Sequence, residues 1–126
     1  MDPLYREIIL DNWQNPQNCG VLKDADIDVT ETNPLCGDAI RLTITFKNRK
    51  VRNVLFSGEG CAISQASASL FTEKMKEMSI QTLRNVTDSE ILQLLGIDLT
   101  PARIKCALLI LKTLQKGLVN TDSISK

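Results

Sequence analysis

Four side chains of this sequence have the types and spacing of a sulfur-rich metal site. Cys36 and Asp38 are separated by one residue, and Cys61 and Cys106 follow further along the chain. Thiolates are soft donors that suit zinc or iron–sulfur chemistry, and three of them with one carboxylate fill the four positions of a tetrahedral ion. The chain has no histidine. We therefore expect chemistry centred on sulfur, with neither an imidazole ligand nor a Ser-His-Asp or Cys-His catalytic pair.

The residues next to two of the cysteines favour a ligand cluster. Gly37 lets the backbone curve, so that Cys36 and Asp38 can approach one ion. Cys61 lies between a glycine-rich turn and the expected start of a helix, where unpaired backbone N–H groups and the helix dipole favour a reactive or metal-bound thiolate. The alternative for Cys61 is a small buried apolar residue in a crowded strand-to-helix corner.

Two cations lie close to Cys106 in the sequence. Arg103 is expected in the first turn of a helix, where a cation opposes the helix dipole at about 0.3–1 kcal/mol, and a nearby anionic centre would offset this. A divalent ion bound by three thiolates and a carboxylate keeps a net negative charge, which Arg103 and Lys105 would balance. The alternative is two ordinary surface cations. Cys19 fits none of these patterns, and we interpret it as incidental, since four thiolates would leave Asp38 redundant.

The elements that position these residues can be predicted from apolar periodicity. Helices are expected over residues 3–13 and 61–78, over a short segment that begins with a capping box at Thr87 and ends at Gly96, and over residues 101–117. Between the first two helices, residues 26–30 and 40–46 have the alternation of strands, and residues 51–56 are expected to form a third, less regular strand after a polar turn. We expect an α+β domain with a three-stranded antiparallel sheet.

The length and charge of the chain indicate how many domains it has and which kinds of partner it binds. Its 126 residues suit a single domain, which we place at residues 1–118, followed by a disordered tail at 119–126. Fifteen basic and fifteen acidic residues cancel, and only 4% of residues are aromatic, so we expect neither nucleic-acid nor membrane binding. The sequence contains no signal-peptide pattern and no long apolar run, and we expect a cytoplasmic protein whose cysteines are free thiols or metal ligands.

Three cysteine-containing segments resemble the motifs of the IscU/SufU/NifU-N family of iron–sulfur cluster assembly proteins. They are Asn-Pro-Leu-Cys-Gly-Asp at 33–38, Gly-Glu-Gly-Cys-Ala-Ile-Ser at 58–64 and Arg-Ile-Lys-Cys-Ala at 103–107. Leu-Tyr-Arg at 4–6 and Asn-Pro-Gln-Asn at 15–18 also resemble the SufU branch. The resemblance covers residues 4–117, and it implies a compact α+β fold with a small three-stranded antiparallel sheet packed against about five helices.

The resemblance also implies a site and two alternative activities. Cys36, Asp38, Cys61 and Cys106 would gather at one exposed end of the molecule. IscU-type scaffolds assemble a [2Fe-2S] cluster there and pass it on, whereas SufU-type proteins hold zinc and accept sulfur from a pyridoxal-phosphate cysteine desulfurase. By similarity to SufU, Cys36 is the sulfur acceptor, with Cys106 as the alternative, and Arg103 stabilises the anionic site. The implied partners are a SufS-like or IscS-like desulfurase and downstream iron–sulfur assembly or recipient proteins.

Several features distinguish the two activities. Lys105 stands where IscU scaffolds carry a histidine, and the Gly-Glu-Gly before Cys61 is SufU-like. The segment at 99–103 also departs from the one by which IscU proteins engage their dedicated chaperone. The short step from Cys61 to Cys106, in contrast, is closer to IscU, because SufU proteins usually carry an insertion there. The sequence favours a zinc-bound sulfur acceptor, a sulfurtransferase, with a [2Fe-2S] scaffold as the alternative and a purely structural zinc module as a third class.

Overall fold

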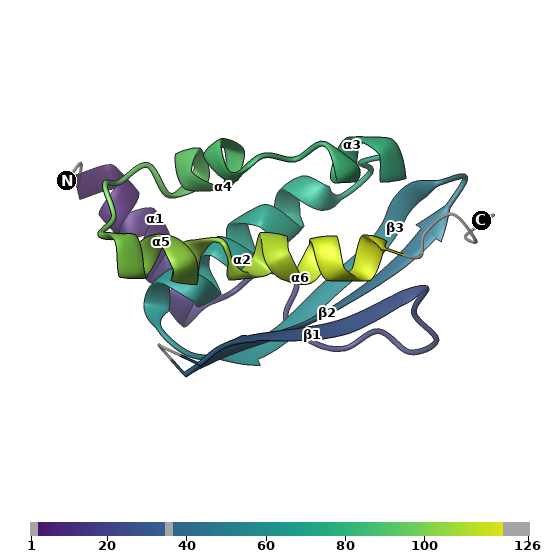
Figure 1. Cartoon of the computed structure of the whole chain (residues 1–126), viewed down its shortest axis with the longest axis horizontal. Helices are drawn as coiled ribbons and strands as arrows, with labels where there is room; N and C mark the ends of the chain where they lie inside the picture. The colour runs from purple at the N-terminus through teal and green to yellow at the C-terminus, as the bar shows by residue number, and fades with distance from the viewer. Residues whose placement is uncertain (1–2, 35–36, 120–126) are drawn as a thin grey trace.

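Three antiparallel strands form a sheet, and two of the helices pack directly against it (Figure 1). This computed structural model describes residues 3–34 and 37–119. The strands are β1 (Ile27–Asn33), β2 (Asp38–Lys47) and β3 (Lys50–Glu59), in this order across the sheet. β1 and β2 pair over their length, so that Asn33 at the end of β1 lies opposite Asp38 at the start of β2. The predicted sheet is therefore confirmed.

Six helices are found in the part of the chain that the structure describes. They are α1 (Pro3–Gln14), α2 (Ala62–Met75), α3 (Ile80–Arg84), α4 (Asp88–Leu95), α5 (Pro101–Ala107) and α6 (Leu109–Leu118). The α+β fold class is confirmed. Two details differ from the sequence prediction: α3 was not expected, and the single helix predicted at 101–117 is broken into α5 and α6.

The break between α5 and α6 lies at Leu108, where a side chain from another helix enters the backbone hydrogen-bond ladder. The hydroxyl of Ser67 in α2 donates to the carbonyl of Ala107, with an Oγ–O distance of 2.6 Å, and both residues are buried. A side chain inserted into a helix ladder is a recognised cause of a break. This interaction joins positions forty residues apart, which apolar periodicity cannot reveal.

Replacing Ser67 with alanine is expected to lower the free energy of unfolding by about 1–3 kcal/mol, because the buried Ala107 carbonyl loses its donor. Urea denaturation measures the change. Ser89→Ala, at an exposed position of α4, is the matched control and should shift the free energy by less than about 0.5 kcal/mol. Equal effects of the two substitutions would contradict this explanation of the break.

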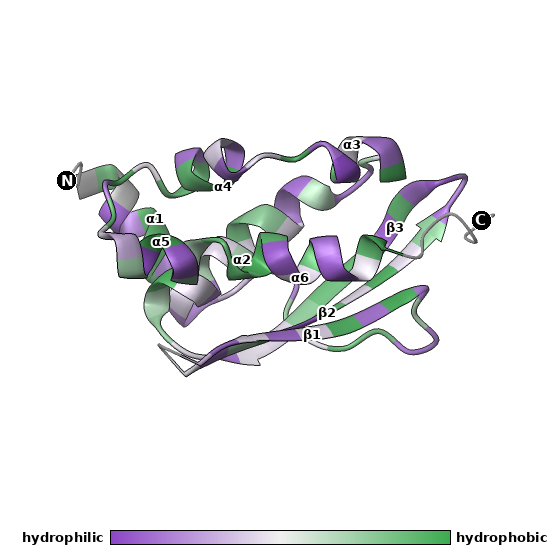
Figure 2. Cartoon of the chain, in the orientation of Figure 1, coloured by the Kyte–Doolittle hydropathy of each residue, from purple (hydrophilic) through white to green (hydrophobic). Residues whose placement is uncertain are grey.

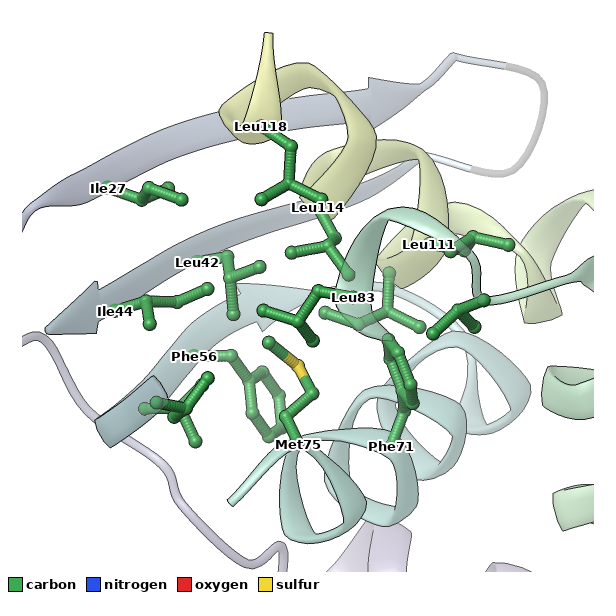
Figure 3. Packing of buried hydrophobic residues seen from close by; sticks show 14 of the residues in the cluster. Ile27, Leu42, Ile44, Phe56, Phe71, Met75, Leu83, Leu111, Leu114 and Leu118 are labelled. Atoms are coloured by element: carbon green, nitrogen blue, oxygen red, sulfur yellow. The ribbon is translucent and has the colours of Figure 1, made fainter. Parts of the chain in front are cut away.

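The main hydrophobic core lies between one face of the sheet and the two helices that cross it, α2 and α6 (Figures 1 and 3). Ile40, Leu42 and Ile44 project from the central strand and are completely buried. Buried side chains from the neighbouring strands and from helices α2, α3 and α6 belong to the same cluster. Those labelled in Figure 3 are Ile27, Phe56, Phe71, Met75, Leu83, Leu111, Leu114 and Leu118. In Figure 2, hydrophobic and hydrophilic residues alternate along α6, as expected for a helix with one buried face.

The short helices α3 and α4 form an outer layer over α2 (Figure 1). The predicted capping box is present at the start of α4: the Thr87 hydroxyl accepts from the Glu90 N–H, and the Glu90 carboxylate accepts from the Thr87 N–H. Gly96 ends the helix in the left-handed conformation, with φ of 65°. α3 is capped by Ser79 and has only five residues. A helix of this length is too short to show a periodic apolar pattern.

A second, smaller cluster of buried side chains joins α1 to the ends of three other helices. It consists of Ile9, Ala66, Leu95 and Ala107. These contacts hold α2 and α5 together at the end of the molecule where Cys61 and Cys106 lie. None of the helices within residues 3–34 and 37–119 combines the length and the hydropathy needed to cross a membrane. Residues 120–126, nearly all of the predicted tail, lie outside the described residues.

Candidate metal centre

Three of the predicted ligands meet at one end of the sheet. Asp38 is the first residue of β2, Cys61 immediately precedes α2, and Cys106 lies in the last turn of α5. These element ends lie together at the left of Figure 1. One carboxylate oxygen of Asp38 and the Sγ atoms of Cys61 and Cys106 all lie within 4.8 Å of one another. Elements far apart in the sequence thus bring three soft or anionic donors to one point.

Asp38 is held by the backbone of Cys61. Its Oδ1 accepts a hydrogen bond from the Cys61 N–H at 2.8 Å, and its Oδ2 lies 3.8 Å from Cys61 Sγ. Asp38 is almost completely buried, with 1% of the residue's surface exposed. A carboxylate that accepts a backbone N–H at the start of a helix is favourably placed, since the N-terminal end of the helix carries partial positive charge. One oxygen is therefore fixed by the backbone while the other faces the thiol.

Gly60 makes this close approach possible. A Cβ atom at this position would lie 2.8 Å from Asp38 Cα and would overlap the Asp38 carboxylate. The backbone of Gly60 also has a φ of 139°, which side-chain-bearing residues rarely adopt. The glycine before Cys61 is thus required by the packing of Asp38 as well as by the turn itself.

Cys106 is held from two sides in the interior. Its side chain is completely buried. Its Sγ accepts a hydrogen bond from the Asn33 side-chain amide, with an Nδ2–Sγ distance of 3.8 Å, and lies 3.6 Å from the Ala102 carbonyl one turn earlier in α5. The sequence does not mark Asn33 as a site residue, although this asparagine opens the same segment that contains Cys36 and Asp38.

The spacing of these donors fits a small tetrahedral ion. Zinc binds sulfur at about 2.3 Å and carboxylate oxygen at about 2.0–2.2 Å, which places neighbouring ligand atoms of a tetrahedron roughly 3.6 Å apart. The distance of 3.8 Å from Asp38 Oδ2 to Cys61 Sγ is close to this value. All three donor atoms lie within 4.8 Å of one another, so only small side-chain movements would bring them to the distances of a tetrahedral site. The donor set of two sulfurs and one oxygen suits zinc or iron.

The remaining predicted site residues either are not part of this cluster or lie outside the residues that the structure describes. Cys36 belongs to the two internal residues, 35–36, that the structure does not describe, so its place in the site stays a prediction. Arg103 and Lys105 are exposed on α5, and neither forms an ion pair with any residue in 3–34 or 37–119. Their role in balancing the charge of the site also stays a prediction. Cys19 is exposed, and its backbone pairs with Phe56 of β3.

The fold and the cluster together define a class of protein: a small α+β domain whose sheet end gathers thiols and a carboxylate from a strand and two helices. Comparison with known families agrees with this class. The chain belongs to the family of the NifU-like N-terminal domain, whose family model matches residues 4–126.

Curated relatives match this chain over nearly all of its length. It is 40% identical, over an alignment of 141 positions, to the zinc-dependent sulfurtransferase SufU of Bacillus subtilis. The alignment covers 97% of this chain and 94% of the relative. It is also 40% identical over 116 residues to the iron-sulfur cluster assembly scaffold protein IscU of Aquifex aeolicus, covering 90% of this chain and 73% of the relative. The chain is thus similar to proteins of both branches.

A solved structure supports the same assignment. A protein of Fervidobacterium islandicum AW-1, described as an iron-sulfur cluster assembly scaffold protein for the SUF system, matches with a TM-score of 0.77 and 29% identity. The match covers 89% of this chain and 94% of that protein. The likeness in fold therefore extends over most of the chain.

Proposed function

We propose that this protein is a zinc-bound sulfur acceptor in iron–sulfur cluster biogenesis, and that it takes persulfide sulfur from a pyridoxal-phosphate cysteine desulfurase. The observation that carries the proposal is the cluster of Asp38, Cys61 and Cys106 donor atoms at one end of the sheet. The similarity to the zinc-dependent sulfurtransferase of Bacillus subtilis supports it. We place the protein and its desulfurase in the cytoplasm.

The proposed ligands are Asp38, Cys61 and Cys106 from the cluster, with Cys36 as the fourth. Bound zinc would keep the thiols deprotonated and ordered until the sulfur donor docks. Asp38 is already oriented for this, because its Oδ1 is held by the Cys61 N–H and its Oδ2 faces the Cys61 sulfur. Arg103, exposed in the first turn of α5, would balance the negative charge of the ligand set.

The transfer step requires one thiolate of this chain, which we assign to Cys36. The thiolate attacks the outer sulfur of the donor's persulfide, so that a new S–S bond forms on Cys36 while the S–S bond of the donor breaks. The donor cysteine leaves as a thiolate, and the proton of the persulfide moves with the transferred sulfur. The exchange is a thiol–disulfide type of substitution and needs no external oxidant or reductant.

A [2Fe-2S] scaffold is the second candidate function. It is favoured by the similarity to the Aquifex scaffold protein. The alignment to the Bacillus protein also spans more positions than this chain has residues, so that relative carries segments without a counterpart here. Against the scaffold, the whole chain lacks histidine, and Lys105 precedes the last cysteine. Anaerobic reconstitution followed by transfer of an intact cluster to an apo-protein would support the scaffold.

The proposal predicts that the zinc-loaded protein accelerates a cysteine desulfurase of the same organism. Sulfide or alanine production should rise when the wild-type protein is added, and Cys36→Ala should abolish the gain while Cys19→Ala retains it. Metal analysis of anaerobically purified protein should show stoichiometric zinc. A desulfurase rate that the wild-type protein leaves unchanged would contradict the proposal. A loss of secondary structure on zinc removal, measured by circular dichroism, would instead support a structural zinc module.

A further inference from the structure

The side-chain amide of Asn33 is directed at one thiol of the cluster and at no other described sulfur. The Nδ2–Sγ distance to Cys106 is 3.8 Å, within the range of a hydrogen bond to sulfur. Asn33 is 9% exposed and Cys106 is completely buried, so water competes little with this interaction. A protonated sulfur atom is a weak hydrogen-bond acceptor. A buried amide that donates to such an atom therefore indicates a specific role for the amide.

The register of the sheet fixes the position of this amide. Asn33 ends β1 directly opposite Asp38, which begins β2, and side chains of directly opposed residues lie on the same face of a sheet. The two buried side chains therefore act on two different cysteines from one strand pair: Asp38 contacts Cys61, and Asn33 contacts Cys106. Rigid strand ends hold both contacts.

The two described contacts of the Cys106 sulfur come from groups of opposite kind. The Ala102 carbonyl, 3.6 Å away, can only accept a hydrogen bond. The Asn33 amide donates to the sulfur at 3.8 Å, and a donor is the partner that suits a sulfur bound to a metal, because such a sulfur carries negative charge. The amide is therefore placed to hold the Cys106 side chain in the orientation of a metal ligand.

We propose that Asn33 is a positioning residue that orients the Cys106 sulfur towards the metal and keeps it bound there. This inference rests on the proposed zinc site. Partners of a metal ligand outside the coordination sphere often have this function, and their loss weakens metal affinity by about 10–100-fold.

The test compares wild-type protein with Asn33→Ala, the isosteric Asn33→Asp, and the control Thr32→Ala. Thr32 is the exposed neighbour of Asn33 in β1. Zinc affinity is measured by competition with a chelator, and the thiolate-to-metal absorption bands are recorded on the Co²⁺-loaded protein. Alkylation of Cys106 in the zinc-loaded protein is followed by peptide mass spectrometry. We expect both Asn33 variants to lose affinity by about 10-fold or more, to shift the absorption bands and to alkylate faster at Cys106.

The outcomes separate this inference from the function on which it rests. Wild-type protein that binds no Zn²⁺ would contradict the proposed function and this inference with it. Wild-type binding together with Asn33 variants that match Thr32→Ala in absorption bands and Cys106 alkylation would overturn the inference alone, even if their affinity fell through loss of stability. Because Asn33→Asp keeps the side-chain volume and replaces the donor by a negative charge, it gives the answer should Asn33→Ala fail to fold.

Discussion

Replacing Cys61 with serine is expected to weaken zinc binding by about 100-fold or more. Apparent zinc-binding free energies of about 10–16 kcal/mol are shared among four ligands, and a neutral hydroxyl is a poor substitute for a thiolate. Cys61 supplies a sulfur to the cluster and a backbone N–H to Asp38. Serine removes only the sulfur, so the Asp38 hydrogen bond and the start of α2 should persist. Competition with a chromophoric chelator measures the change.

Cys19→Ser is the matched control for this experiment. It makes the same chemical change at an exposed thiol in the segment that pairs with Phe56, and it should leave zinc affinity unchanged. The far-ultraviolet circular dichroism of both variants should match the wild type in the presence of zinc. If the two serine variants bound zinc equally well, Cys61 would not be a ligand.

Replacing Gly60 with alanine is expected to damage both stability and metal binding. The new Cβ atom would lie 2.8 Å from Asp38 Cα, so the backbone at the end of β3 must move away from β2. The φ of 139° adds backbone strain, for which about 1–3 kcal/mol is typical. Moving this backbone also displaces the Cys61 N–H that orients Asp38. Both the midpoint of thermal unfolding and zinc affinity should fall.

Gly37→Ala separates the effect of backbone strain from the effect of the Cβ overlap with Asp38. Gly37 also has a positive φ, of 69°, but a Cβ atom there would have no atom of the described residues beyond its chain neighbours within 4 Å. Its substitution should therefore add only the strain of a left-handed residue, about 1 kcal/mol, with a smaller fall in the unfolding midpoint. If Gly37→Ala were as damaging as Gly60→Ala, close packing against Asp38 would not explain the glycine before Cys61.

Local patterns explain which parts of the fold could be predicted from the sequence. The first two strands follow from alternation, the third follows from an apolar segment after a polar turn, and α4 follows from a capping box whose partners are three residues apart. The break at Leu108 could not be predicted, because it depends on the Ser67 hydroxyl of a different helix. Helix α3 was missed because its five residues contain too little periodic signal.

The candidate site shows the same division between local and distant information. Residue types and motif resemblance were sufficient to name Asp38, Cys61 and Cys106, which the structure brings together. The contact of Asn33 with Cys106 joins β1 to α5, and no spacing within either segment indicates it. The reverse holds for Arg103, whose expected link to the site rested on sequence proximity, while its exposed side chain pairs with none of the described residues.

Direct detection of the transferred sulfur is the most decisive test of the sulfur-acceptor proposal. The zinc-loaded protein is incubated with a cysteine desulfurase and cysteine, alkylated, digested and analysed by mass spectrometry. The proposal predicts one additional sulfur atom on the peptide that contains Cys36, and none on the peptides that contain Cys106 or Cys19. Its absence from the Cys36 peptide, although the desulfurase itself carries persulfide, would contradict the proposal.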